Sequence, residues 1–334
     1  LKTLTEINAP SGHEQAIRRF LLDELKKLGF APVLDRMGNV VVVKEGTGDA
    51  PRKRVMVSAH MDEVGLIVTS ATEDGYLRIA AAGGIDPRVL VSKRVTVGED
   101  KLPGVIGAVP IHLQSAAERK HVLSMDELLV DIGAKNKDEA ERKAPMGTYI
   151  SFDTPYVEYG DGFACGKAFD DRVGCLSLLR LLQEELPVDL VACFVSEEEV
   201  GCRGAKGAAF QQEPDIGIVL EGTTCNDLGD VPETAHVCEA GQGVAVSFMD
   251  GASIANRALF RKALDVAKQE NIPHQVKHSV SGGNDGGAIQ RAREGVPVLV
   301  LSVPCRYIHS PSSVVKLSDV ESQFALVKAL VKAL

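Results

Sequence analysis

Side chains that can bind metals or move protons follow several apolar runs of this sequence. The run RVMVSA, residues 54–59, leads into a histidine and an aspartate, and VDLVACFVS, residues 188–196, leads into three consecutive glutamates. Two later runs, DIGIVL and VPVLVLSV, precede one further acid and one further histidine. In chain order these residues are His60 with Asp62, Glu197 to Glu199, Glu221 and His309.

Imidazoles and carboxylates together form a nitrogen and oxygen ligand set that suits Zn²⁺, Co²⁺ or Mn²⁺. The set is large enough for two cations, which one shared carboxylate can bridge at about 3.5–4 Å, as in metal-assisted hydrolysis. A remaining carboxylate can then serve as general base for a water molecule. A further pair, Asp170 and Asp171, opens the helical segment DDRVGCLSLLRLL, where Asp170 could instead be only a helix cap.

The same residues also have ordinary structural interpretations. A run of glutamates is often a solvated helix face, and a single histidine is often a hydrogen-bonded structural residue. Their position favours chemistry, because ligands in open α/β sheets collect outside the carboxyl ends of the strands. In a continuing strand Glu198 and Glu199 would point to opposite sides. Gly201 is well placed to relax the backbone bend that would let both face one site.

The segments around these residues predict a sheet covered by helices. Residues 11–29, SGHEQAIRRFLLDELKKLG, carry a capping box of Ser11 and Glu14 and an apolar helical face closed by Gly29. From Cys165 onward, helical patterns alternate with apolar strand-like runs. This alternation predicts the α/β class, with a mixed, mostly parallel sheet sandwiched by helices.

The pattern changes between about Val64 and Gly162. Glycine and proline there separate short β-rich runs such as YLRIAA, RVTVG and GTYISF, with one helical interruption expected near Met125 to Val130. We therefore predict an inserted small β-rich domain at residues 64–162. Residues 1–63 and 163–334 would together form the catalytic domain.

Composition excludes some partners. The chain has 334 residues, of which 45% are hydrophobic, and a formal net charge of −9. This charge argues against nucleic acid or an anionic membrane as the main partner. Seven cysteines without a CxxC pair indicate free thiols in a reducing cytoplasm. Neither a membrane-spanning run of about 18 apolar residues nor a signal-peptide core is evident.

Five motifs in this order resemble those of the M42 family of di-metal aminopeptidases: SAHMDEVG, GKAFDDRVGC, SEEEVGCRGA, LEGTT and CRYIHSPSSVV. The likeness spans almost the whole chain and includes GGIDPRVL and GVIGAVPIHL in the inserted domain, and SGGNDGGAIQ before the last strand. The resemblance implies a zinc exopeptidase-like fold for the catalytic domain.

The resemblance also implies a role for each site residue. One metal ion would be held by His60, Asp170 and Glu221, and the other by Asp170, Glu199 and His309. Asp170 would bridge the two ions. Glu198 would be the general base, and Asp62 would orient His60 through its ring N–H, as acceptors beside metal-ligating histidines usually do.

Two acids near these motifs are less defined. Glu197 is left without a role. Asp285, in SGGNDGGAIQ, is expected to cap the following helix or to shape the substrate side of the site.

The implied reaction is removal of N-terminal residues from short peptides with a free N-terminus. Two divalent ions, zinc or cobalt with manganese as a further candidate, would activate the attacking water, and Glu198 would carry its proton to the leaving amine. The inserted domain would be a dimerisation module. The resemblance implies a homo-oligomer built from dimers, up to a hollow dodecamer.

Several alternatives stay open. A related metal-dependent amidohydrolase, such as a deacylase or carboxypeptidase, would use the same metals on another amide. Paired carboxylates alone could support an endoglucanase, but the histidines beside them favour metals. A non-catalytic peptide-binding scaffold is the alternative from another class, and the intact general base Glu198 argues against it.

Overall fold

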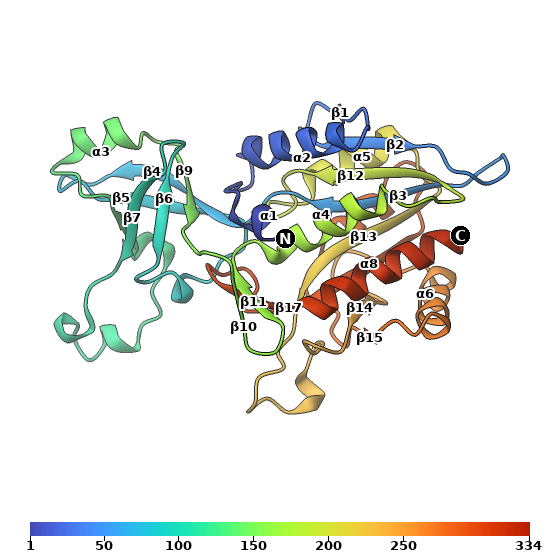
Figure 1. Cartoon of the computed structure of the whole chain (residues 1–334). Helices are drawn as coiled ribbons and strands as arrows, with labels where there is room; N and C mark the ends of the chain where they lie inside the picture. Colours follow the sequence, from blue (N-terminus) through green and yellow to red (C-terminus); the bar gives the residue numbers. More distant parts are fainter.

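In the computed structural model the chain forms two sheets, a large mixed sheet covered by helices and a small closed barrel to one side of it (Figure 1). The structure describes residues 1–334, apart from the side chain of Glu118. The mixed α/β class expected from the alternation of helical and apolar runs is confirmed.

The large sheet has a parallel centre. Its four central strands, in spatial order, are β12 (Asp189–Val195), β3 (Arg54–His60), β13 (Ile216–Thr224) and β16 (Val298–Arg306). Because these strands run in one direction, their carboxyl ends meet at one edge of the sheet.

The flanks of the large sheet are antiparallel. Beside β12 lie β2 (Val40–Lys44) and β1 (Val33–Leu34), and beside β16 lie β17 (Ser313–Lys316), β11 (Phe163–Gly166) and β10 (Val157–Tyr159). A branch from β16 adds β14 (Val244–Ser247), which is antiparallel to β16, and β15 (His274–Val276), which is parallel to β14.

The prediction of a mostly parallel sheet is therefore right for the centre and wrong for the flanks. Parallel neighbours need a crossover of about a dozen residues or more. Residues 160–162 between β10 and β11, and residues 307–312 between β16 and β17, are too short for such a crossover. These connections impose antiparallel pairing.

Helices cover both faces of the large sheet because apolar residues alternate along its strands. In β3, Val55 and Val57 belong to one core and Met56 to the opposite one. The first core is covered by α1 (Lys2–Glu6), α2 (Gln15–Lys27), α4 (Phe169–Leu181), α6 (Arg257–Gln269) and α8 (Leu317–Lys332). The second is covered by α5 (Arg203–Gln212) and α7 (Asp285–Gln290).

The barrel closes on itself around a separate apolar core. Its strands, in spatial order, are β4 (Gly65–Ala71), β5 (Leu77–Ala82), β8 (Leu129–Asp131), β7 (Leu102–Gly107), β6 (Arg94–Val97) and β9 (Tyr149–Phe152). Although β10 also lies within residues 64–162, it pairs with β11 of the large sheet.

The helical interruption expected near Met125 to Val130 is only one short turn. A 3₁₀ turn spans Met125–Glu127, and β8 then begins at Leu129, where it pairs with β5 and β7. This tertiary pairing overrides the helical pattern, and the α-helix of the region is α3 (Lys137–Lys143). The other 3₁₀ turns span Pro87–Val89, Ile111–Leu113, Glu118–Lys120 and Glu233–Ala235.

The capping box predicted for Ser11 and Glu14 is wrong. Helix α2 begins at Gln15 without a side-chain cap, and the Ser11 hydroxyl instead donates to Asp62 Oδ2 at 2.6 Å. Glu14 Oε1 accepts from the Gly12 amide at 2.7 Å. Ser11 is thus engaged by a residue far along the chain, which the local pattern cannot reveal.

Among the helices that the structure describes, none combines the length and apolar character needed to cross a bilayer.

Candidate active site

The residues singled out in the sequence come together at the carboxyl edge of the parallel strands. His60 is the last residue of β3, and Glu198 and Glu199 lie in the loop after β12. His309 lies in the loop between β16 and β17, and Asp170 lies at the start of α4, which packs on β3 and β13. Glu221 lies inside β13, because this strand continues to Thr224 and does not end at the apolar run.

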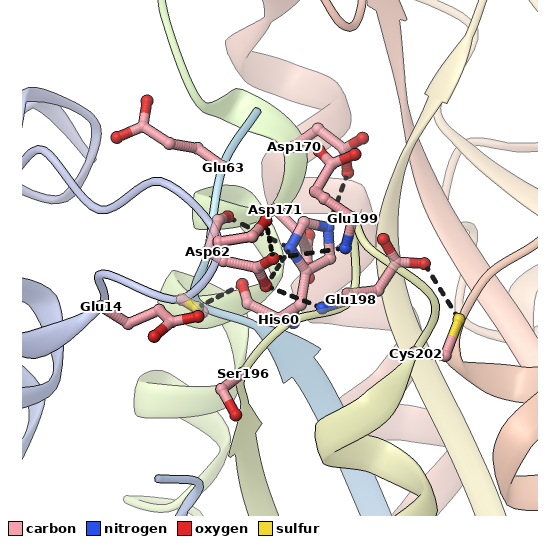
Figure 2. A network of polar contacts seen from close by, with 12 residues as sticks. Glu14, His60, Asp62, Glu63, Asp170, Asp171, Ser196, Glu198, Glu199 and Cys202 are labelled. Atoms are coloured by element: carbon pink, nitrogen blue, oxygen red, sulfur yellow. Dashed lines mark hydrogen bonds and ion pairs between the residues drawn. The ribbon is translucent and has the colours of Figure 1, made fainter. Parts of the chain in front are cut away.

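Asp170 stands between two groups of side chains. Its Oδ1 is 3.3 Å from His60 Nε2, and Glu221 Oε2 is 3.6 Å from the same nitrogen. Its Oδ2 is 3.5 Å from His309 Nε2, and Glu199 Oε2 is 3.3 Å from that nitrogen. The five expected ligands therefore form two groups that share one carboxylate, and Figure 2 shows His60, Asp170 and Glu199 converging.

The donor set fits divalent cations. His60, Asp170 and Glu199 each offer a ligand atom, and these atoms lie within 4.8 Å of one another. Glu221 is buried, and its Oε1 accepts no hydrogen bond. A buried acceptor without a donor is unfavourable unless another group satisfies it. A cation between the histidines and carboxylates would do so with the nitrogen and oxygen ligands that such ions prefer.

Asp171 is held differently from Asp170. Its Oδ1 accepts from the Gly174 amide at 2.9 Å and its Oδ2 from the His60 amide at 3.2 Å. The capping role considered for Asp170 thus falls to Asp171. Asp171 also lies close enough to His60 and Glu221 to offer an oxygen to a cation, but both of its oxygens already accept backbone hydrogen bonds.

Asp62 organises the loop that carries the two glutamates. Its Oδ1 accepts from the Glu198 amide at 3.1 Å, and its Oδ2 from the Glu199 amide at 3.2 Å and the Ser11 hydroxyl at 2.6 Å. The ring Nδ1 of His60 is 3.4 Å from Asp62 Oδ1 and 3.2 Å from its backbone oxygen. One buried carboxylate therefore contacts the histidine and fixes the direction of the loop (Figure 2).

The bend after β12 begins earlier than expected. Gly201 has a φ of 119°, but Glu197 already has a φ of 55°, which is uncommon for a residue with a side chain. The Glu197 carboxylate is 3.2 Å from Arg203. The bend lets Glu199 reach His309, while Glu198 turns its carboxylate toward Cys202.

Electrostatics at the site favour bound cations. Burial raises the pKa of Glu199 to about 8 and the pKa of Glu221 well above its ordinary value. Burial alone would lower the pKa of His309, but Asp170 and Glu199 outweigh it and raise this pKa to about 9. Burial also raises the pKa of Glu198. Divalent cations would instead favour ionised carboxylates and neutral imidazoles.

A cavity of about 320 Å³ adjoins the site. Asp170, Glu198, Glu221 and His309 line it from the site side, and Lys277 lines it as well. Lys277 is 9% exposed, and in the described structure its ammonium group has no hydrogen-bond or ion-pair partner. No spacing in the sequence distinguishes Lys277, because it follows the short edge strand β15 in an irregular segment.

Asp285 and Cys202 also lie near Glu198. Asp285 does not cap α7, because the Asn284 side chain accepts from the Gly286 amide and takes that role. Cys202 was not singled out in the sequence, yet its Sγ lies 3.4 Å from Glu198 Oε1. Only the three-dimensional arrangement brings these residues to the site.

Comparison with known proteins gives the family. A sequence profile of M42 glutamyl aminopeptidase matches residues 38–326. The chain therefore belongs to the M42 family and is an aminopeptidase, a hydrolase of peptide bonds. The resemblance seen in the five motifs is confirmed.

Three similar proteins cover nearly the whole chain. The lysyl aminopeptidase of Pyrococcus furiosus is 33% identical over 100% of this chain and 96% of its own length. The glutamyl aminopeptidase of Lactococcus lactis is 33% identical over 100% of this chain and 95% of its own length. The TET1 peptidase of Pyrococcus horikoshii, described as assembling into a tetrahedron or a large octahedral shell, superposes with a TM-score of 0.87 at 33% identity, covering 100% of this chain and 98% of that one.

Proposed function

We propose that this aminopeptidase is metal-dependent and removes N-terminal residues from short peptides. The observation that carries the proposal is the position of Asp170, whose two oxygens face two separate pairs of a histidine and a glutamate. Such an arrangement suits two cations bridged by one carboxylate.

The proposed ligands are divided between two sites. His60, Asp170 and Glu221 would hold one ion, and Asp170, Glu199 and His309 the other. Zinc or cobalt fits this set, with manganese as a further candidate. When bound, the ions would polarise the scissile carbonyl and lower the pKa of the attacking water.

Glu198 is the proposed general base. It lines the cavity beside the ligands, whereas Glu199 is a proposed ligand and Glu197 pairs with Arg203. Its carboxylate would accept the proton of the attacking water and return it to the leaving amine. Asp62 would support this step by holding the Glu198 and Glu199 amides, so that neighbouring side chains serve different tasks.

We further propose that the enzyme prefers an acidic residue at the substrate N-terminus. Relatives of equal similarity are named for lysyl and for glutamyl substrates, so similarity does not decide the preference. The side chain of Lys277 lines the cavity with an ammonium group that has no partner in the described structure. An ammonium group without a partner gains from an anionic ligand in the cavity, and a lysine substrate would instead meet a like charge.

Exposed apolar residues on the barrel support a proposal for the oligomeric state. Outward-facing Val105, Val109, Ile111, Leu113 and Met146 on and around it are exposed, and exposed apolar patches often mark interfaces. We propose that residues 64–162 mediate dimerisation and that dimers build a homo-oligomer, up to a dodecamer, in the cytoplasm. Sedimentation that gave only a monomer would contradict this assembly.

One experiment tests the metal requirement and the base together. Wild type and Glu198→Gln are chelated, supplied again with Co²⁺ or Zn²⁺, and assayed for release of N-terminal residues from a panel of aminoacyl substrates. Activity restored by metal in the wild type alone is the expected result. A different result would favour a deacylase. In that case the metal-loaded wild type would release no N-terminal residue but would turn over acyl-amino acids.

The acidic preference is tested by Lys277→Gln. The ratio of kcat/KM for glutamyl over leucyl substrates should fall by about 10–100-fold, because a charge-assisted contact of about 1.5–3 kcal/mol is lost. His278→Gln is the matched control on the next residue. An unchanged ratio in Lys277→Gln would exclude Lys277 from recognition of the substrate side chain.

A further inference from the structure

A third group of possible metal ligands lies beside Glu198, outside the two groups that share Asp170. Glu198, Cys202 and Asp285 each offer one ligand atom, and the three atoms lie within 4.8 Å of one another. The thiol of Cys202 donates to Glu198 Oε1 at 3.4 Å, as Figure 2 shows. These residues come from the loop after β12 and from the start of α7.

Asp285 gives independent evidence that this group can hold a ligand. Its side chain is fully buried, and neither carboxylate oxygen accepts a hydrogen bond. The thiol of Cys202 has one proton, so it cannot donate to Glu198 and Asp285 at the same time. A buried carboxylate in this state is unfavourable unless it takes up a proton or meets a cation.

The charge of the surroundings also favours another cation. Seven carboxyl groups gather here, namely Asp62, Asp170, Asp171, Glu198, Glu199, Glu221 and Asp285. The two proposed divalent ions would offset four negative charges and Lys277 one more, which still leaves an excess of acid. Burial raises the pKa of Asp285 well above its ordinary value, so protons supply part of the balance when no further cation is present.

We propose that Glu198, Cys202 and Asp285 bind a third divalent cation, Zn²⁺, and that this binding inhibits the enzyme. The inhibitory part rests on the proposed role of Glu198 as general base, because a carboxylate held by a cation cannot accept a proton from water. Binding displaces the thiol proton of Cys202 and the carboxyl proton of Asp285 to solvent, and no electrons are transferred.

The chemistry of the ligands selects the cation. A thiolate with two carboxylates suits Zn²⁺ or Cd²⁺ better than Mg²⁺ or Ca²⁺, which prefer oxygen ligands alone. Cavities reach two of the three ligands, whereas Asp285 is fully buried behind them. Glu198 lines the substrate cavity, and Cys202 lines a separate groove of about 760 Å³ beside α5.

The binding test uses Cd²⁺ as probe, because a cadmium thiolate absorbs in the near ultraviolet and the two sites around Asp170 contain no sulfur. Enzyme already loaded with Zn²⁺ is titrated with Cd²⁺, and absorption and bound metal per chain are recorded. We expect a saturable absorption band in the wild type and its loss in Cys202→Ser and Cys202→Ala. Asp285→Asn should weaken the binding that produces the band by at least about 10-fold, because loss of even an outer-shell partner typically costs about that much affinity.

A second cysteine variant controls for other thiols. Cys225 is also buried, in a separate small cluster with Cys238, and Cys225→Ser should keep the band. A band that persists in Cys202→Ser, or its absence from the wild type, would overturn the proposed site. This readout does not depend on turnover, so it decides the site even if the proposed peptidase mechanism fails.

The inhibition is tested separately by titrating active enzyme with excess Zn²⁺. Each variant is compared with its own activity before the excess is added. The Zn²⁺ concentration that halves activity should rise at least about 10-fold in Cys202→Ser relative to the wild type. Equal sensitivity in both proteins would refute inhibition through this site, and the hydrogen bond from Cys202 would then serve only to hold Glu198.

Discussion

The carboxyl edge of the large sheet, called the rim below, and the inside of the barrel differ in the kind of side chain that they bury. The rim buries His60, Asp62, Asp171, Glu221 and Asp285 beside one another. Among the described side chains of residues 65–152, the only buried polar one is Ser151, and the barrel core is otherwise apolar. The barrel is stabilised by removing apolar surface from water, whereas the rim gathers like charges that repel unless cations or protons balance them.

This difference separates stability from function. Apolar contacts in the barrel should contribute to folding whatever is bound, whereas the rim should contribute fully only when cations are present. The orphaned oxygens of Glu221 and Asp285 show which parts of the rim its own hydrogen bonds leave unsatisfied. Substitutions in the two regions should therefore affect different measurements.

The largest effect is expected for Glu198→Gln, which removes the proposed base from the rim. Its kcat should fall by about 10²–10⁴-fold, the usual contribution of general acid–base catalysis, while the two proposed sites around Asp170 still bind metal. Glu197→Gln is the matched control, because Glu197 pairs with Arg203 beside the site. Steady-state kinetics measure both, and a similar loss in the two variants would show that the loop, and not the base, had been disturbed.

The next effect belongs to the barrel. Ile106→Ala should lower the free energy of unfolding of the barrel by about 2–5 kcal/mol, because the substitution leaves a cavity at a fully buried position. Lys93→Ala, at an exposed position whose backbone oxygen accepts from the Ile106 amide, should change this free energy by no more than about 0.5 kcal/mol. Both changes are measured by unfolding each variant in urea and monitoring hydrogen exchange in peptides of the barrel. If Ile106→Ala impaired kcat in folded, metal-loaded protein, the two regions would not be separable.

Removal of metal should affect the rim and spare the barrel. At a free metal concentration about 100 times Kd, binding contributes about 2.7 kcal/mol to stability. Chelation should therefore speed hydrogen exchange in β13 and in the loop after β12, with little change in β4 to β9. Uniform acceleration across both regions would contradict the separation proposed here.

Metal affinity should fall as the pH falls. The pKa of Glu199 at about 8 and that of His309 at about 9 mean that both groups carry protons at pH 7 in chelated protein. Cations must displace these protons, so affinity should drop by roughly 10-fold per pH unit for each proton displaced. Calorimetric titration between pH 6 and pH 9 measures this slope, and an affinity independent of pH would argue against these two ligands.

The sequence predicts what depends on local pattern. The long apolar runs locate β3, β12, β13 and β16, and their shared direction explains why the expected ligands meet. The prediction of a helix after Ser11 is confirmed, and Ile17, Leu21 and Leu25 are buried on one face of it. Periodicity suffices here because burial of one face determines the element.

The features that the sequence does not reveal depend on partners far along the chain. Ser11 binds Asp62 and not its own helix, and Cys202 meets Asp285 from another element. The antiparallel flanks and the strand β8 likewise result from pairing that no local pattern encodes. Lys277 is recognisable only once the cavity that it lines is known.

Two cations that share Asp170 are the central feature proposed for this enzyme. The most direct measurement is the number of tightly bound Co²⁺ ions per chain in wild type, His309→Ala and Asp170→Asn, each titrated with Co²⁺ after chelation until its tight sites are filled. We predict two ions in the wild type, one in His309→Ala and neither held tightly in Asp170→Asn. Two tightly bound ions in Asp170→Asn would contradict the shared carboxylate and with it the proposed metal centre.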